Sequence, residues 1–337
     1  MENEIKIYRN EDYLKLKEFV LPWNATRIYD LSNLANHNFL KWYYTSSKYC
    51  YLTYIEEEGK IKGIVGCERI PFLAGGGEKE ILLIKDVYAE KGYGGRLIKA
   101  AMNRSKYVGG LGISLQAGKI YRHYGWKDIT ANLEKYKYFY RVRRNPLINF
   151  AFYLFSELST FLLLLICFIE QRLRKVGFLE SKYFTESDSE YINSAVKTYD
   201  NTPRRTVEYL NWRFNTENKF IKYKILKIKK RAKYIGYIVI GIQEEKRNAT
   251  ISDLLISKQD LYLSSLIIRE AIQVCKKYKV KRLSMISSLP EIKHSLKINL
   301  FFRVPFEDDF MMTNYSEASF QGFWHITTGF SDMDFYT

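Results

Sequence analysis

Two landmarks in this sequence recur at one fixed distance. Trp42 in the segment LKWYY and Trp212 in the segment LNWRF are 170 positions apart, and so are Gly66 and Gly236, each the interior glycine of a β-rich run. Asp86 in ILLIKDVY resembles Asp253 in ISDLLIS at a distance of 167, as expected if a loop lost a few residues. The shared offset indicates a duplicated unit, which constrains the fold more than any single motif.

Both copies have the same predicted order of elements. An opening helix and the LxW helix precede a pair of strands, the Asp-containing strand, a helix and further strands, an order that implies α/β or α+β layering. We expect tandem domains at 1–145 and 179–337, joined by an apolar helical connector at 146–178. In the first domain the pattern predicts helices at 96–105 and 119–123, a strand at 108–117 and aromatic strands within 126–142.

The composition is that of a packed globular protein with acidic partners. The 337 residues are 47% apolar and 16% aromatic, and the formal net charge is +16. A basic chain favours a phosphorylated cofactor, a nucleotide-linked substrate, an anionic membrane face or a nucleic acid. Because no zinc-finger or RNP-like aromatic motif accompanies the charge, we do not expect nucleic-acid binding.

The cysteines and the amino terminus indicate a reducing compartment. Cys50, Cys67, Cys167 and Cys275 have no CxxC spacing, so we expect reduced thiols in the core and neither a metal site nor a disulfide framework. The first residues are charged throughout and lack the apolar region of a secretory signal, which predicts a cytoplasmic location.

The segment Leu147–Ile169 is unusually apolar and ends in the run FLLLLICFI, with arginines on both sides. It is long enough to span a bilayer, which takes ~20 residues, but a span would place the two similar halves on opposite sides of the membrane. Three interpretations stay open: an interfacial helix with basic anchors at the inner face of the plasma membrane, a helix buried between the domains, and a true span.

A glycine-rich turn follows the Asp86 strand. In KDVYAEKGYGGRL a strand runs into Gly92, Gly94 and Gly95 and then into a helix, so backbone N–H groups at the helix start can converge on a phosphate. There is no GK[ST] for a P-loop and no full GxGxxG fingerprint. A turn without any ligand is the alternative reading.

About thirty residues later comes a second segment, Tyr121–Trp126 (YRHYGW). Together the two segments resemble the GNAT (Gcn5-related N-acetyltransferase) superfamily, with its [Q/R]xxGx[G/A] loop and its later YxxxGF segment. Ala89 to Gly94 occupies the first pattern, although Ala89 stands where the family usually has Gln or Arg. The resemblance covers residues 5–143 directly. It extends to residues 180–337 only by way of the positions that repeat between the two halves.

This resemblance implies two tandem GNAT-like domains, each with a mixed, mostly antiparallel twisted sheet flanked by helices. It implies direct transfer of an acetyl group from acetyl-CoA to an amine, without a metal. The backbone of Val87 and Tyr88 would pair with the pantetheine arm, and Tyr121 would protonate the leaving thiolate. The diphosphate would be received by Lys91, Gly92, Tyr93, Gly94, Gly95 and Arg96. Candidate bases are Glu68, Glu80 and Asp86.

The acceptor is indicated only by further resemblance. The tail from Trp324 to Asp334 resembles bacterial proteins of surface-polysaccharide assembly, which implies an amino sugar as the acceptor. The second half has no glycine in its matching stretch, Ser252–Leu263, so we expect it not to bind acetyl-CoA and instead to shape the acceptor site or to stabilise the first half. Two other functions stay open: an aminoacyl transferase of cell-wall synthesis, and a catalytically silent pair that senses acetyl-CoA or serves as a scaffold.

Overall fold

The computed structural model describes residues 5–25, 33–113, 115–128, 133–140, 158, 161–163, 165–166, 168–305, 309–313, 320 and 324–328. The first half contains β1 (Ile5–Ile7), η1 (Asn10–Asp12), α1 (Tyr13–Ala25), α2 (His37–Leu40), the π-helical turn η2 (Lys41–Thr45), β2 (Cys50–Glu57), β3 (Lys60–Ala74), β4 (Gly77–Ala89), α3 (Gly94–Met102), β5 (Tyr107–Ile113), α4 (Leu115–His123), β6 (Lys127–Asp128) and β7 (Glu134–Phe139). The second half contains β8 (Val176–Ser181), η4 (Glu186–Asp188), α6 (Ser189–Val196), β9 (Asn201–Pro203), α7 (Val207–Arg213), β10 (Lys222–Lys230), β11 (Lys233–Gln243), β12 (Asn248–Ile256), η5 (Lys258–Leu263), α8 (Ser264–Lys277), β13 (Arg282–Ser287), α9 (Pro290–Ile298), β14 (Phe302–Val304) and β15 (Asp309–Met312).

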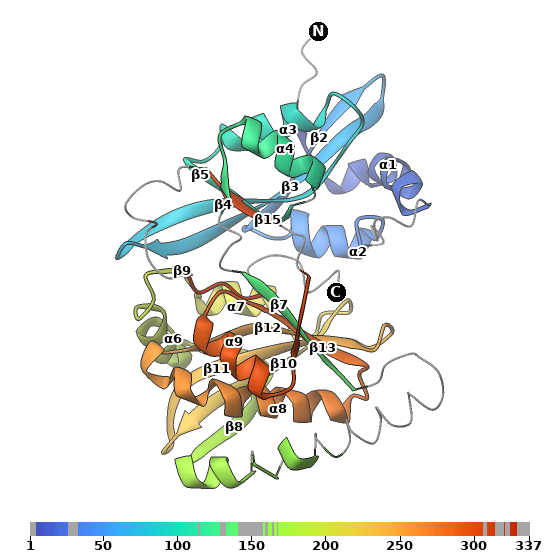
Figure 1. The fold of residues 1–337 in the computed structure, drawn as a ribbon. Coiled ribbons are helices and arrows are strands. Elements are labelled where there is room, and N and C mark those ends of the chain that lie inside the picture. Colours follow the sequence, from blue (N-terminus) through green and yellow to red (C-terminus); the bar gives the residue numbers. More distant parts are fainter. Residues whose placement is uncertain are drawn as a thin grey trace.

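The strands form two sheets with the same internal order (Figure 1). One sheet runs β1-β2-β3-β4-β5-β15-β6, with the short strand β9 of the second half paired to the end of β3, and the other runs β8-β10-β11-β12-β13-β7-β14. Each contains one parallel pair at the same place, β4 with β5 and β12 with β13, and the remaining strand pairs are antiparallel. The duplicated organisation predicted from the fixed offset is confirmed, and so are the mixed, mostly antiparallel sheets.

The two halves exchange one strand. β7 belongs to the first half of the sequence but pairs with β13 and β14, while β15 returns to the first sheet between β5 and β6 (Figure 1). We expected the aromatic strands within 126–142 to stay in the 1–145 domain, but Tyr136 and Tyr138 are buried in the core of the second half. The two strands occupy equivalent places, since β15 lies between β5 and β6 and β7 lies between β13 and β14. Each half thus supplies the other with the strand that its own sheet lacks at that place, as in domain swapping.

The repeated LxW segments meet at the junction of the halves. The rings of Trp42 and Trp212 lie 6.3 Å apart, and Tyr43 stacks on Trp212 at 5.6 Å. The α7 helix begins where the Thr206 hydroxyl caps it, accepting from the N–H of Tyr209 at 3.1 Å. The repeated LxW segments, which indicated the duplication, therefore also form an aromatic contact between the two halves.

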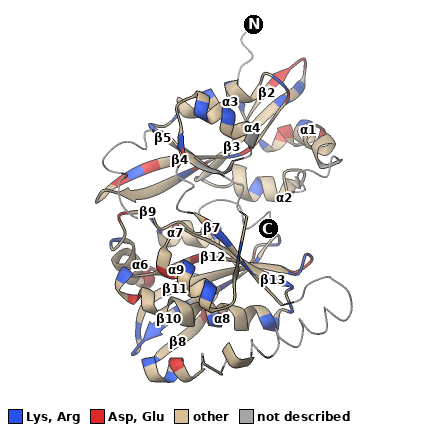
Figure 2. Cartoon of the chain, viewed as in Figure 1, with Lys and Arg blue, Asp and Glu red and all other residues tan. Residues whose placement is uncertain are grey.

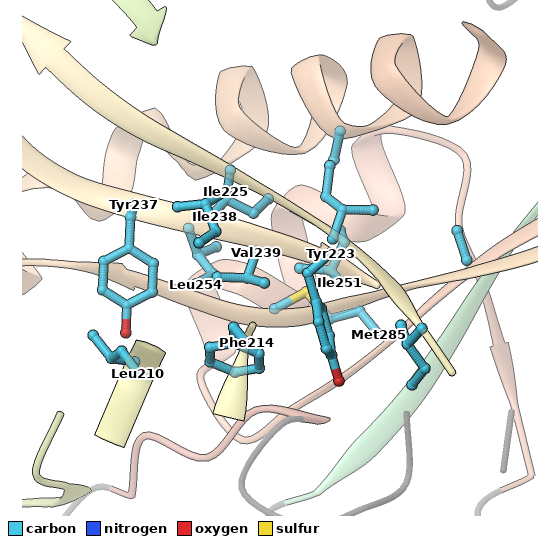
Figure 3. Close-up of a cluster of buried hydrophobic side chains, with 14 of the residues drawn as sticks. Leu210, Phe214, Tyr223, Ile225, Tyr237, Ile238, Val239, Ile251, Leu254 and Met285 are labelled. Carbon is cyan, nitrogen blue, oxygen red and sulfur yellow. The ribbon is translucent and has the colours of Figure 1, made fainter. Parts of the chain in front are cut away.

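The second sheet carries a large apolar core (Figure 3). It packs against the end of α7, and the labelled side chains are Leu210, Phe214, Tyr223, Ile225, Tyr237, Ile238, Val239, Ile251, Leu254 and Met285. Gly236 is required here because a Cβ would lie 2.1 Å from the carbonyl oxygen of Leu255. The equivalent Gly66 makes room for a side chain, since a Cβ there would lie 2.3 Å from the Tyr44 hydroxyl.

Several local predictions need adjustment. The strand expected at 108–117 ends at Ile113, because Leu115 already begins α4. Cys50, Cys67 and Cys275 are buried free thiols, as predicted, and Cys167 lies outside the described residues. The part of the predicted connector before position 158 lies entirely outside them. Within the described part of the chain, no helix has both the length and the apolar character needed to cross a membrane.

Candidate functional site

The parallel strands β4 and β5 separate near the glycine turn. They pair only over Ile81–Ile84 and 107–110. Beyond that point β4 forms a bulge in which Asp86 and Val87 stand opposite a single residue of β3, and Asp86 takes a positive φ of 46°. Among the described residues no strand pairs with β4 on this side after Ile84. The backbone of Val87 and Tyr88 therefore borders a gap in the sheet.

A short turn connects the end of β4 to α3. Gly92 has φ +97°, and the N–H of Tyr93 donates to the carbonyl of Glu90 at 3.2 Å. The turn is anchored at its sides, since Tyr93 donates to the Glu57 carboxylate and Lys62 pairs with Glu90 at 3.1 Å. A side chain at position 92 is excluded by backbone conformation and not by crowding, because a Cβ there meets nothing within 4 Å.

The first turn of α3 has free donors. Tyr93 is the N-cap and makes no side-chain cap, and the N–H groups of Gly94 and Gly95 have no acceptor among the described residues. The first N–H groups of a helix have no intrahelical partner and carry the positive end of its dipole. With Lys91 and Arg96 exposed beside it, this turn has the properties of an anion-binding site.

The tyrosine segment lies on the same face of the sheet as α3. Tyr121 is 2% exposed in α4 and stacks on Trp126 at 4.3 Å, in the apolar cluster that contains Leu97 of α3. The Tyr124 hydroxyl donates to the carbonyl of Gly95 at 3.2 Å, so the two sequence motifs are in contact. Burial, and secondly the Cys67 thiol, raise the pKa of Tyr121 above its usual value, which keeps the phenol protonated at neutral pH.

Glu68 and Asp86 have different surroundings. Glu68 is fully buried on the opposite face of β3, where it forms an ion pair with Lys85 and accepts a hydrogen bond from Tyr209 of α7 at 2.7 Å. Asp86 is half-buried at the bulge and accepts a hydrogen bond from Tyr44. Glu80 is exposed before the parallel pairing begins. The structure thus brings Asp86 to the gap in the sheet and holds Glu68 in a buried network.

Sequence reasoning missed part of that network. Lys85 is 5% exposed and also donates to the Tyr43 hydroxyl at 2.8 Å. A lysine in the middle of the apolar run ILLIKD is the signal that was available, because lysine is almost never fully buried without a partner. Nothing in the sequence pointed to Tyr209, which comes from the other half.

The equivalent place in the second half is closed by side chains. Asp253 accepts from Arg205 at 2.8 and 3.0 Å, from Tyr237 at 2.7 Å and from Thr327 at 2.8 Å. In the turn that follows β12, the N–H of Lys258 already donates a hydrogen bond to the Thr198 hydroxyl at 3.0 Å. Burial would raise the pKa of Asp253, but the Arg205 guanidinium outweighs it and lowers this pKa to about 2. Among the described residues, these contacts occupy the Asp253 carboxylate and the first N–H of η5.

Comparison with solved structures identifies the architecture. A tandem GNAT protein from the clavulanic acid biosynthesis pathway superposes with a TM-score of 0.57 over 92% of this chain and 98% of its own, at 7% identity. The chain has the tandem GNAT-like fold. Saccharomyces cerevisiae N-myristoyltransferase with bound myristoyl-CoA is similar at a TM-score of 0.59, 10% identity and coverage of 93% and 83%.

A third neighbour is a conserved protein of Enterococcus faecalis V583 described as a probable N-acyltransferase, with a TM-score of 0.53, 11% identity and coverage of 94% of this chain and 73% of that one. No protein-family model and no curated protein matches the sequence. The fold is thus shared over most of the chain, at sequence identities of only 7–11%.

Proposed function

We propose that the chain is an acetyl-CoA-dependent N-acyltransferase. The observation that carries this proposal is the uncapped start of α3, where the amides of Gly94 and Gly95 follow a positive-φ glycine at the gap between β4 and β5. A diphosphate fits such a turn because it is held by main-chain donors and a helix dipole. The neighbouring backbone of Val87 and Tyr88 is placed to pair with an extended pantetheine arm.

The chain's own groups would then perform two tasks. Acetyl-CoA, when bound, supplies a thioester carbonyl that an acceptor amine can attack. Tyr121 holds a proton on the α3 side of the sheet and would donate it to the leaving sulfur. Asp86 is a better candidate than Glu68 for accepting the amine proton, because both oxygens of Glu68 already bind Lys85 and Tyr209.

For the acceptor we propose an amino sugar of cell-envelope polysaccharide assembly. Trp23 of α1 and Tyr88 of β4 are half-buried with ring centroids 6.1 Å apart, on the side of β4 where Asp86 meets Tyr44. Such a pair of aromatic faces suits the apolar face of a sugar ring. The described part of the tail, Trp324–Thr328, is buried between the halves, which gives it a structural role.

The test compares Tyr121→Phe with wild type in an assay that follows thiol release from acetyl-CoA in the presence of glucosamine-type amines. We expect turnover to fall by about 100-fold or more while acetyl-CoA affinity stays the same, because only proton donation is lost. Tyr8→Phe is the matched control, since Tyr8 is equally buried and its hydroxyl has no partner among the described residues.

Unchanged turnover in Tyr121→Phe would remove the proposed acid. Binding of CoA without turnover on any amine would favour the silent binding protein instead. That second function is supported by the departure at Ala89 and by the closed site of the second half.

A further inference from the structure

The helical segment before β8 exposes its apolar side chains. Half of the sixteen exposed large hydrophobic side chains of the described residues fall within this short stretch, each 44–77% exposed. They are Leu158, Phe161, Leu162, Leu165, Ile166, Phe168, Ile169 and Leu173, and together we call them the apolar face. The segment lies at the end of the molecule opposite the first sheet, beside α8 (Figure 1). Contiguous exposed apolar surface of this kind marks an interaction site.

Two polar side chains of the same segment, Glu170 and Gln171, contact α8. Glu170 forms an ion pair with Arg269 of α8, and Gln171 donates to Glu270 at 3.0 Å. Leu163 is buried against the core of the second half. This is the reverse of the pattern of a helix that faces water, whose apolar stripe is turned to the core. The polar contacts fix the helix on α8 so that the apolar face is directed outward.

A basic cluster lies beside the end of this helix. The register of β8 with β10 and a 2.9 Å hydrogen bond from the N–H of Arg231 to the carbonyl of Lys175 place the β10–β11 turn next to it. The cluster consists of Arg172, Lys175, Lys229, Arg231 and Lys233, and none of these five forms an ion pair within the described part of the chain. Figure 2 shows basic residues where the tip of β10 approaches the helix end.

We infer that the apolar face and the basic cluster form a docking surface for an anionic lipid bilayer. The apolar side chains would enter the boundary between headgroups and acyl chains, and the five cations would meet lipid phosphates. A second copy of the chain fits this surface less well. A symmetric dimer buries the same patch on both copies, and among the described residues this patch contains no acidic side chain that could meet the basic cluster. This inference stands independently of the proposed transferase activity.

Vesicle flotation with the full chain tests the docking surface. We expect binding to vesicles of phosphatidylcholine mixed with phosphatidylglycerol and much weaker binding to phosphatidylcholine alone. Leu165→Glu combined with Ile169→Glu removes part of the apolar face and should abolish flotation. Arg231→Glu combined with Lys233→Glu should lower the partition coefficient at least tenfold, because each basic residue near an anionic surface adds to binding.

Matched controls lie on other surfaces. Leu14→Glu with Phe302→Glu changes two side chains that are 69% and 55% exposed, and Lys41→Glu with Lys60→Glu makes the same charge change in the first half. Both control pairs should float like wild type, and circular dichroism shows that each variant is folded. Equal binding of wild type to neutral and anionic vesicles, or equal flotation of all variants, would overturn the inference. So would a dimer seen by light scattering that becomes monomeric in the Leu165→Glu and Ile169→Glu variant without any vesicle binding.

Discussion

Glu68 and Lys85 are buried charges that depend on each other. In Lys85→Met the Glu68 carboxylate loses its cation inside the protein, so we expect the free energy of unfolding to fall by about 3–5 kcal/mol. Replacing both residues, as in Lys85→Met with Glu68→Leu, should recover part of this loss, because no unpaired charge then remains. Urea denaturation measures both effects. If the double variant were no more stable than the single one, the two charges would not be coupled.

His325 should make stability depend on pH. It is fully buried and stacks on Tyr199 at 4.3 Å. Burial, and then the Arg205 guanidinium, lower the pKa of His325 from 6.5 to about 3. Below pH 6.5 the unfolded chain therefore binds a proton that the folded chain does not, and stability is lost as the pH falls toward 3.

The measurement is urea denaturation of wild type and His325→Phe between pH 6.5 and 5. For wild type we expect the free energy of unfolding to decrease by up to about 1.4 kcal/mol per pH unit from this group. The phenyl ring keeps the stacking on Tyr199 but cannot titrate, so the variant should show a flatter profile. Identical slopes would show that the imidazole takes up its proton equally in both states.

At the scale of the elements, Gly66 of β3 and Gly236 of β11 occupy equivalent positions but make room for different groups. Gly236→Ala sets a methyl group against the backbone of β12, which cannot move without breaking the sheet, whereas Gly66→Ala meets the end of the Tyr44 side chain. We expect Gly236→Ala to cost more than the ~1–3 kcal/mol typical of overpacking and Gly66→Ala to cost less than Gly236→Ala. Thermal denaturation ranks the two, and the opposite order would contradict this account.

The elements nearest the candidate site were predictable for local reasons. The GYGG turn before α3 was predictable because glycine readily adopts the positive φ that a tight turn requires. The LxW segments are helical, as their repetition in the two halves predicted. The ends of the elements were less predictable, since Leu115 begins α4 in a stretch that resembles a continuing strand. The network around Glu68 was not predictable, because Tyr209 reaches it from 141 residues away.

For the whole molecule, the exchange of β7 and β15 ties the halves together. Neither sheet is complete without a strand from the other half, and pairing between distant segments leaves no signal in local periodicity. We therefore expect a single cooperative unfolding transition by calorimetry for the full chain. Two separate transitions, or a fragment 1–145 that folds alone, would show that the exchange does not couple the halves.

The central claim is that the start of α3 binds the coenzyme's diphosphate, and calorimetric titration of acetyl-CoA into Gly94→Glu tests it most directly. A Cβ at this position meets only the Cβ of Ala89, at 3.7 Å, so the fold should tolerate the change while the new carboxylate repels the diphosphate. We predict binding to wild type and to Gly77→Glu, a control at the exposed first residue of β4, and none to Gly94→Glu at unchanged thermal stability. Equal affinity in all three proteins would contradict the account.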